Sequence, residues 1–146
     1  MINRKILAVV ALMACSTALQ AAEHTVKLLT SSANGMMVME PGYLKIASGD
    51  SVKFVPSDVS HNASSYSIPT GAAKFNTAMG KTETVNFKNE GVYIYNCTPH
   101  LALGMVGVIQ VGSAVNIEQT NTAAAQISTK IMMNKERLAG YIAQIK

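Results

Sequence analysis

Short runs of alternating apolar and polar residues fill the chain from Thr25 to about Val111, and this pattern limits the fold more than any other feature. Gly, Pro, Asn, Asp and Ser separate the runs, as is typical of strands joined by turns in an antiparallel β-domain. Strands at this spacing favour two packed sheets with Greek-key connections. The sequence therefore predicts a mainly β fold, a Greek-key β-sandwich. Its expected strands are 26–28, 43–46, 51–55, 84–87, 92–95 and 106–111, with a turn at Gly49-Asp50.

The composition changes after this β-region, where apolar residues recur at helical spacing. We expect two C-terminal α-helices that cover the sandwich. Asn116 could cap the first helix, and Ser128 or Thr129 the second. Lys135 and Arg137 are expected on a solvated face of the second helix. The recurring apolar residues are Ile117, Ala124, Ile127, Ile131, Leu138, Ile142 and Ile145.

The first residues are typical of an export signal. A charged start that includes Arg4 and Lys5 precedes an apolar run, 6–14, and small residues follow as far as Ala21 or Ala22. The apolar run is too short to span a bilayer. We therefore expect a cleaved signal peptide and a mature protein in the periplasm.

The mature chain is expected to form a single domain. Removal of the signal peptide, 1–21, leaves 22–146, which we divide into a β-sandwich, 22–112, and a helical extension, 113–146. Loss of the two basic residues of the signal lowers the formal net charge from +4 to +2. A mildly basic domain of this size predicts a monomer without a membrane span and gives no indication of nucleic-acid binding.

The two cysteines do not suggest a disulfide. Cys15 lies in the signal, where Leu-Met-Ala-Cys also resembles the site at which bacterial lipoproteins are acylated, so lipid anchoring is an alternative route. Cys97 is then a lone thiol in an oxidising compartment, where metal binding would protect it.

The chemistry is concentrated in one loop between two apolar runs. Cys97, His100 and Met105 have the spacing C-x-x-H-x-x-x-x-M. A short loop between neighbouring strands, bent at Pro99, can turn all three side chains toward one point. His61, from an irregular segment expected at the same end of the sandwich, supplies a second imidazole. A thiolate, two imidazoles and a weak thioether are the ligands of a blue copper site, which carries one electron at a time.

These residues resemble the cupredoxins, and among them the pseudoazurin family. The resemblance covers nearly the whole mature chain. Plastocyanins and amicyanins share the ligand loop but are not expected to have the helical tail, so the tail favours pseudoazurin. The matching stretches are Cys-Thr-Pro-His at 97–100, Gly-Met-Val-Gly-Val at 104–108, His61-Asn62, Met-Glu-Pro at 39–41, 49–54, Ile-Pro at 68–69 and Glu-Arg-Leu at 136–138.

The resemblance implies a role for each residue of the predicted site. His61 corresponds to a buried ligand and Cys97 to the thiolate ligand. His100 corresponds to the more exposed imidazole through which electrons enter and leave, and Met105 to the axial ligand.

Three further residues are expected around the ligands. The resemblance implies that Asn62 ties the two ligand loops together and that Met37 packs near the exposed imidazole. Pro99 shapes the loop between Cys97 and His100. By family, the electrons would pass to a copper nitrite reductase or to c-type cytochromes, in denitrifying respiration.

The sequence departs from the family around the exposed imidazole. Pseudoazurins commonly have lysines there, whereas this chain has Asn96 before the cysteine and Val59-Ser60 before the first ligand. Leu101 and Leu103 make the ligand loop more aliphatic. We therefore expect partner docking to depend more on apolar contact.

Other functions are compatible with parts of the pattern. A copper storage or delivery protein is the main alternative, although the loop is more compact than an exchangeable site. A thiol enzyme is disfavoured because no third residue orients the Cys–His pair, and structural zinc would gain nothing from Met105. The remaining histidine, His24, is interpreted as an exposed strand residue without a role.

Overall fold

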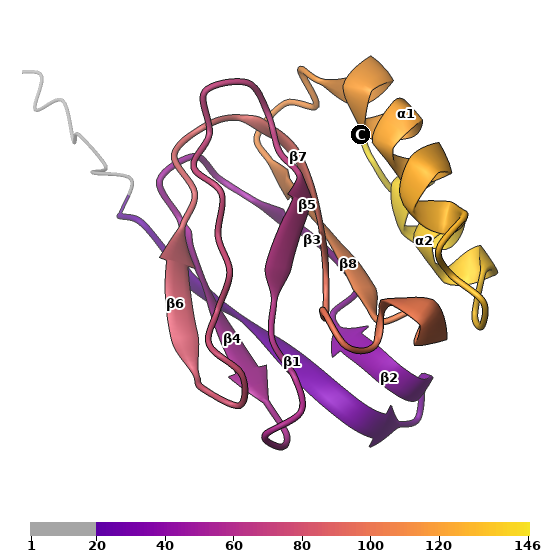
Figure 1. Ribbon diagram of the computed structural model, residues 1–146. Helices are drawn as coiled ribbons and strands as arrows, with labels where there is room; N and C mark the ends of the chain where they lie inside the picture. The colour runs from indigo at the N-terminus through magenta and orange to yellow at the C-terminus, as the bar shows by residue number, and fades with distance from the viewer. Residues whose placement is uncertain (1–19) are drawn as a thin grey trace, which may run out of the picture.

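Two four-stranded sheets pack face to face in the computed structural model, which describes residues 20–146 (Figure 1). The predicted β-sandwich with two C-terminal helices is confirmed. The signal peptide lies outside the described residues as far as residue 19. The first sheet has the order β2-β1-β4-β6, and the second has the order β3-β8-β7-β5. The strands are β1 (Glu23–Ser32), β2 (Gly35–Glu40), β3 (Tyr43–Ile46), β4 (Ser51–Pro56), β5 (Ser64–Ser67), β6 (Glu83–Asn86), β7 (Gly91–Asn96) and β8 (Val106–Val111).

The strand pairing is mixed, so the purely antiparallel prediction is wrong. β1 runs parallel to β4, and β3 runs parallel to β8. The Gly49-Asp50 turn joins β3 to β4, which lie in different sheets. Alternation in the sequence reports which face of a strand is buried and does not report which strand lies beside it.

Apolar side chains of both sheets form the inner core. Phe54 lies against Tyr95 with ring centroids 5.3 Å apart, and Phe87 lies against Tyr93 at 5.0 Å. A second apolar cluster fills the space between β7, β8 and the helices. Both faces of β7 and β8 are therefore covered, and every residue of these two strands is buried. The ligand loop joins these two strands, so both of its ends are fixed by fully buried strands.

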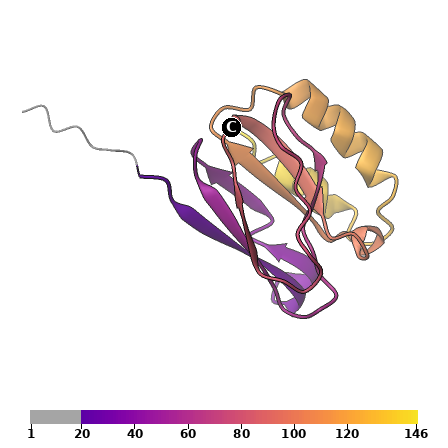
Figure 2. The same ribbon diagram turned by 60° about the vertical axis from the view of Figure 1, so that its left-hand side comes forward.

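The helices α1 (Ile117–Ser128) and α2 (Glu136–Ile142) cover the outer face of the second sheet, as Figure 2 also shows. No helix among residues 20–146 is long and apolar enough to cross a membrane.

Both predicted helix caps differ from what the structure shows. Asn116 precedes α1 but does not cap it, because its side-chain amide bonds to the N–H and C=O of Val92. Ser128 and Thr129 end α1, and α2 begins only at Glu136. Polar residues that could start a helix equally end one, and the sequence does not distinguish the two.

The interpretation of His24 as an exposed strand residue without a role is wrong, because it is only half-exposed and pairs with a buried carboxylate. Its Nε2 lies 2.8 Å from Oδ2 of Asp50, a buried carboxylate that also accepts the N–H of Ala22 at 2.8 Å. These hydrogen bonds, led by the one from Ala22, lower the pKa of Asp50 to about 2. The start of β1 is thereby tied to the turn before β4.

Candidate metal centre

The side chains of His61, Cys97 and His100 converge at one end of the sandwich. The two Nδ1 atoms are 3.2 Å apart, and Sγ of Cys97 lies 3.9 Å from Nδ1 of His61 and 3.5 Å from Nδ1 of His100. These separations place one point in the plane of the three atoms about 2.1 Å from each, within the range of roughly 2.0–2.3 Å for metal bonds to imidazole and thiolate. The donor atoms therefore fit a single metal ion in trigonal arrangement.

Backbone hydrogen bonds bring Met105 to the same place. The N–H of Cys97 donates to the carbonyl of Met105 at 2.9 Å, and the N–H of Met105 donates to the carbonyl of His100 at 3.2 Å. Met105 and Cys97 are fully buried in the same apolar cluster. The four residues are thus positioned to form a type 1 copper site, since a weak thioether beside a His2Cys plane is its donor set.

The ring of His61 is held from behind by two residues that the sequence did not single out. The Thr30 hydroxyl donates to Asp58, and its oxygen lies 2.8 Å from Nε2 of His61. Because that hydroxyl hydrogen is already used, the oxygen accepts from Nε2–H, and Nδ1 is left unprotonated toward the centre. Burial lowers the pKa of His61, which also favours the neutral ring.

Asp58 and Thr30 carried little signal in the sequence. Asp58 lies three residues before His61 and its Oδ2 is 3.3 Å from Nε2, so proximity in the chain could have suggested it. Hydrogen bonds from Ser60 and Thr30 hold the pKa of Asp58 well below its usual range. Thr30 lies on β1, remote in sequence, and only the sheet brings it to the site.

The Cys97 thiol is in surroundings that favour a bound cation. Burial raises its pKa, and hydrogen bonds from the backbone of Asn62 and His100 oppose that rise only in part. Direct coordination to a metal ion would stabilise the charged thiolate form of this buried side chain.

Asn62 lies between the two ligand loops. Its side-chain oxygen accepts the N–H of Thr98 at 2.8 Å, and its amide nitrogen donates to the Thr98 hydroxyl at 3.0 Å and to Asn76 at 2.9 Å. The side chain is 4% exposed. One amide therefore joins the His61 loop to the Cys97 loop.

The other two residues expected near the ligands have different surroundings. Pro99 is exposed in the tight turn closed by a hydrogen bond from His100 N–H to Cys97 C=O at 3.2 Å. Met37 has a left-handed backbone, with φ of 49°, and is packed against the inner core. Its carbonyl accepts from Arg137 Nη1 at 2.7 Å.

The interpretation of Arg137 as part of a solvated face is therefore wrong. Its guanidinium is half-buried and donates to Met37 and to Gly104 in the ligand loop, at 2.8 Å for Gly104. Lys135 is exposed as expected. Helical spacing placed Arg137 correctly on α2, which begins directly after Lys135. It could not show that backbone carbonyls of β2 and of the ligand loop accept hydrogen bonds from Arg137.

Comparison with known proteins agrees with this geometry. Residues 26–112 match the family of copper binding proteins described as the plastocyanin/azurin family. The pseudoazurin of Methylorubrum extorquens is 37% identical, over 100% of this chain and 99% of the relative, and that of Paracoccus pantotrophus is 34% identical over 94% of each. The crystal structure of native pseudoazurin from Hyphomicrobium denitrificans has a TM-score of 0.72 and 36% identity, and covers 85% of this chain and 98% of that one.

The match to the family extends over more than half of the chain, and the alignment with the Methylorubrum extorquens relative extends over the whole chain, beyond residue 112. Together with the convergent donor atoms, these matches leave one assignment. The chain belongs to the plastocyanin/azurin family of copper-binding proteins and, within it, to the pseudoazurins.

Proposed function

We propose that this protein, an electron carrier of the type 1 copper class, works in the periplasm and passes single electrons to a partner protein through His100. Its ligands for one copper ion would be His61, Cys97, His100 and Met105. The convergence of two Nδ1 atoms and one Sγ atom within 3.2–3.9 Å of one another carries this proposal. Copper held by such donors changes between Cu(II) and Cu(I).

The residues around the ligands support a carrier because they fix the donor atoms in advance. Thr30 holds the back of the His61 ring, and Asn62 locks the His61 loop to the Cys97 loop. Donors that cannot move keep one geometry in both oxidation states, so little rearrangement accompanies an electron. A protein that released copper would instead need ligands that can open.

The two imidazoles would have different tasks. His61 is fully buried, whereas His100 is half-exposed at the start of the 3-10 turn η1 (Leu101–Leu103). A partner can approach only His100, so that ring is the proposed port for electrons. The half-buried Leu101 and Leu103 beside it fit a partner that docks by apolar contact.

The proposed partner is a copper nitrite reductase or another respiratory protein such as a c-type cytochrome. Family membership supports this assignment, together with the export signal expected in 1–21. We propose that cleavage after Ala21 or Ala22 leaves the 22–146 domain as a monomer.

An optical titration tests the copper centre. Loading with Cu(II) should give an intense blue thiolate-to-metal band, and Cys97→Ser should abolish it while the protein remains folded. A colourless loaded protein would refute the type 1 assignment. Slow loss of copper to a competing chelator, with a reversible redox couple, would separate a carrier from a storage or delivery protein.

A kinetic experiment tests the partner. The reduced protein should be reoxidised by copper nitrite reductase and nitrite, and Leu101→Lys should slow the bimolecular step without changing the optical spectrum. No reoxidation by this enzyme, with reoxidation by a c-type cytochrome, would exclude the reductase as the acceptor.

A further inference from the structure

The segment Met132–Arg137 lies directly against the ligand loop. It contains the end of the connection between α1 and α2 and the first residues of α2. The C-terminal helices follow the residues that match the copper-binding family, 26–112. Contacts from here to the ligand loop are therefore an addition to the part of the domain that the family shares.

Three successive carbonyl groups of the ligand loop accept hydrogen bonds from this segment. The carbonyl of Ala102 accepts the N–H groups of Met132 and Met133, at 2.9 and 3.1 Å. The carbonyl of Leu103 accepts from Nδ2 of Asn134 at 2.9 Å. The carbonyl of Gly104 accepts from the guanidinium of Arg137. The Gly104 carbonyl also accepts the N–H of Val106 at 3.0 Å. The carbonyls of Ala102 and Leu103, at the end of the short 3-10 turn, have no partner within the turn, so the C-terminal segment supplies the donors that the loop lacks.

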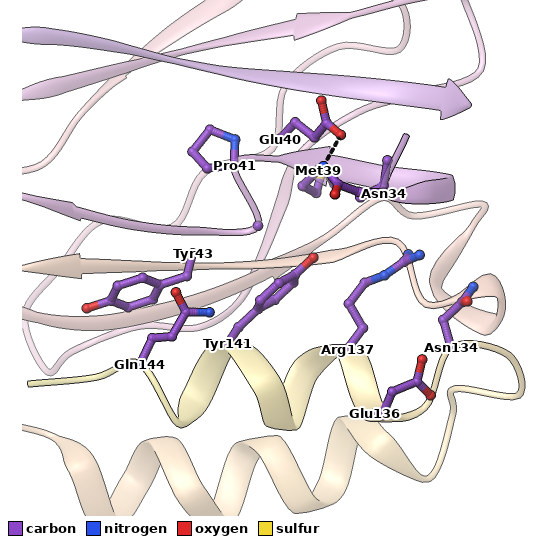
Figure 3. Close-up of a pocket in the computed structure, with 12 residues that line it drawn as sticks. Asn34, Met39, Glu40, Pro41, Tyr43, Asn134, Glu136, Arg137, Tyr141 and Gln144 are labelled. Atoms are coloured by element: carbon purple, nitrogen blue, oxygen red, sulfur yellow. Dashed lines mark hydrogen bonds between the residues drawn. The ribbon is translucent and has the colours of Figure 1, made fainter. Parts of the chain in front are cut away.

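Arg137 joins the ligand loop to a second element. Figure 3 shows its side chain rising from α2 toward the strands, with Asn134 beside it at the start of the helix. One nitrogen, Nη1, donates both to Gly104 and to Met37, and Nη2 reaches the carbonyl of Met36 at 3.3 Å. The planar fork of a guanidinium suits several fixed acceptors, whereas an ammonium group would reach them less well.

The backbones on the two sides of this contact are packed closely together. Gly104 has φ of 78°, and a Cβ placed there would lie 2.6 Å from the carbonyl oxygen of Met133. Asn134 has a left-handed backbone with φ of 52°. Gly104 immediately precedes Met105, so any movement of this contact moves the residue that would supply the axial thioether.

We propose that the segment Met132–Arg137 is a clamp that sets the position of Met105, with Arg137 as its central positioning residue. This inference rests on the proposed function, in which Met105 is the axial ligand. Arg137 also binds the part of β2 that carries Met37, so one side chain relates the axial ligand to a residue expected beside the exposed imidazole.

The positive charge of Arg137 should also affect the reduction potential of the bound copper. A positive charge near the centre disfavours the more positive oxidation state of a bound ion. Because the guanidinium is half-buried, salt screens it less than an exposed charge. Removal of this charge should therefore lower the reduction potential.

The test compares Arg137→Gln with Lys135→Gln. Both variants remove one positive charge from the start of α2, but Lys135 is exposed. In the metal-free protein, Arg137→Gln should speed hydrogen exchange at the Gly104 and Met105 amides about tenfold or more, because hydrogen bonds from charged donors are among the stronger ones. In the copper-loaded protein it should lower the reduction potential and change the relative strengths of the visible bands. Lys135→Gln should leave exchange and the bands unchanged and shift the potential less.

Equal effects of the two variants on exchange and potential would overturn the proposal. Faster exchange with an unchanged potential and spectrum would also overturn it, because the segment would then be structural only. If Arg137→Gln does not fold, Asn134→Gly removes the donor to Leu103 and keeps a residue that tolerates the left-handed backbone. It removes no charge, so it is compared with the parent protein, and both faster exchange at Met105 and a change in the visible bands are expected. Failure of the proposed function is recognised separately, by a colourless copper-loaded parent protein, while exchange in the metal-free protein still tests the clamp.

Discussion

Replacing Asn62 by alanine should destabilise the metal-free protein by about 1.5–4.5 kcal/mol. The amide of Asn62 makes two hydrogen bonds to Thr98 and one to Asn76, and it is 96% removed from solvent. Each bond contributes about 0.5–1.5 kcal/mol net, so the three bonds together contribute about 1.5–4.5 kcal/mol. The sum lies below the stability of about 5–15 kcal/mol typical of a domain, so the variant should still fold.

Equilibrium unfolding in urea measures this loss. The midpoint should fall while the slope of the free energy against urea stays the same, because the surface exposed on unfolding does not change. Asn76→Ala is the matched control. It removes one of the three hydrogen bonds of Asn62 and leaves both bonds between the ligand loops, so its cost should be about 1 kcal/mol.

The copper-loaded proteins extend the same comparison. If Asn62 holds the two ligand loops together, its loss should also move the reduction potential, and the loss of Asn76 should not. A cost for Asn62→Ala as small as that of the control would refute the reasoning, since it would mean that the loops are held by other contacts.

Three further results are expected. Tyr95→Phe should stabilise the protein by about 1 kcal/mol in urea unfolding, because its fully buried hydroxyl has no hydrogen-bond partner in residues 20–146; a clear loss of stability would show that the hydroxyl is paired. The Asp50 carboxyl, whose pKa is lowered from 3.8 to about 2 chiefly by the N–H of Ala22, should contribute stability that is complete above about pH 4 and lost as the pH falls toward 2. Asp50→Asn should therefore flatten the acid limb of the stability curve, and an unchanged limb would assign it to other groups. Asn116→Ala should lower the thermal midpoint, at a cost of about 1–3 kcal/mol, because it strands the N–H and C=O of Val92; no change would mean that water replaces the amide.

The sandwich and the ligand loop could be predicted because both are local patterns. Alternation identified six of the eight strands near their final positions, and the spacing from Cys97 to Met105 placed three donor residues on one loop. The convergence of His61 with this loop could be inferred only from chemistry, because 36 positions separate it from Cys97 and no local pattern links them.

What the sequence did not reveal depends on contacts between distant elements. The parallel pairing of β1 with β4 leaves no trace in alternation, and the Thr30 hydroxyl reaches His61 only because that sheet forms. Arg137 shows the same limitation in another form. Its charge and its place near Lys135 on a predicted helix are typical of a solvated face. Its partial burial is explained only by the carbonyls of Met37 in β2 and Gly104 in the ligand loop.

The three paired carbonyls at 102–104 bear on how this ligand loop could be moved between proteins. Because their donors come from Met132, Met133, Asn134 and Arg137, the loop is only half of a structural unit. Grafted alone onto a copper domain without these helices, it would leave the Ala102 and Leu103 carbonyls to solvent and the Gly104 carbonyl with only the N–H of Val106. The backbone before the axial residue would then lose part of its support. A functional transplant would have to carry the distant C-terminal segment together with the loop.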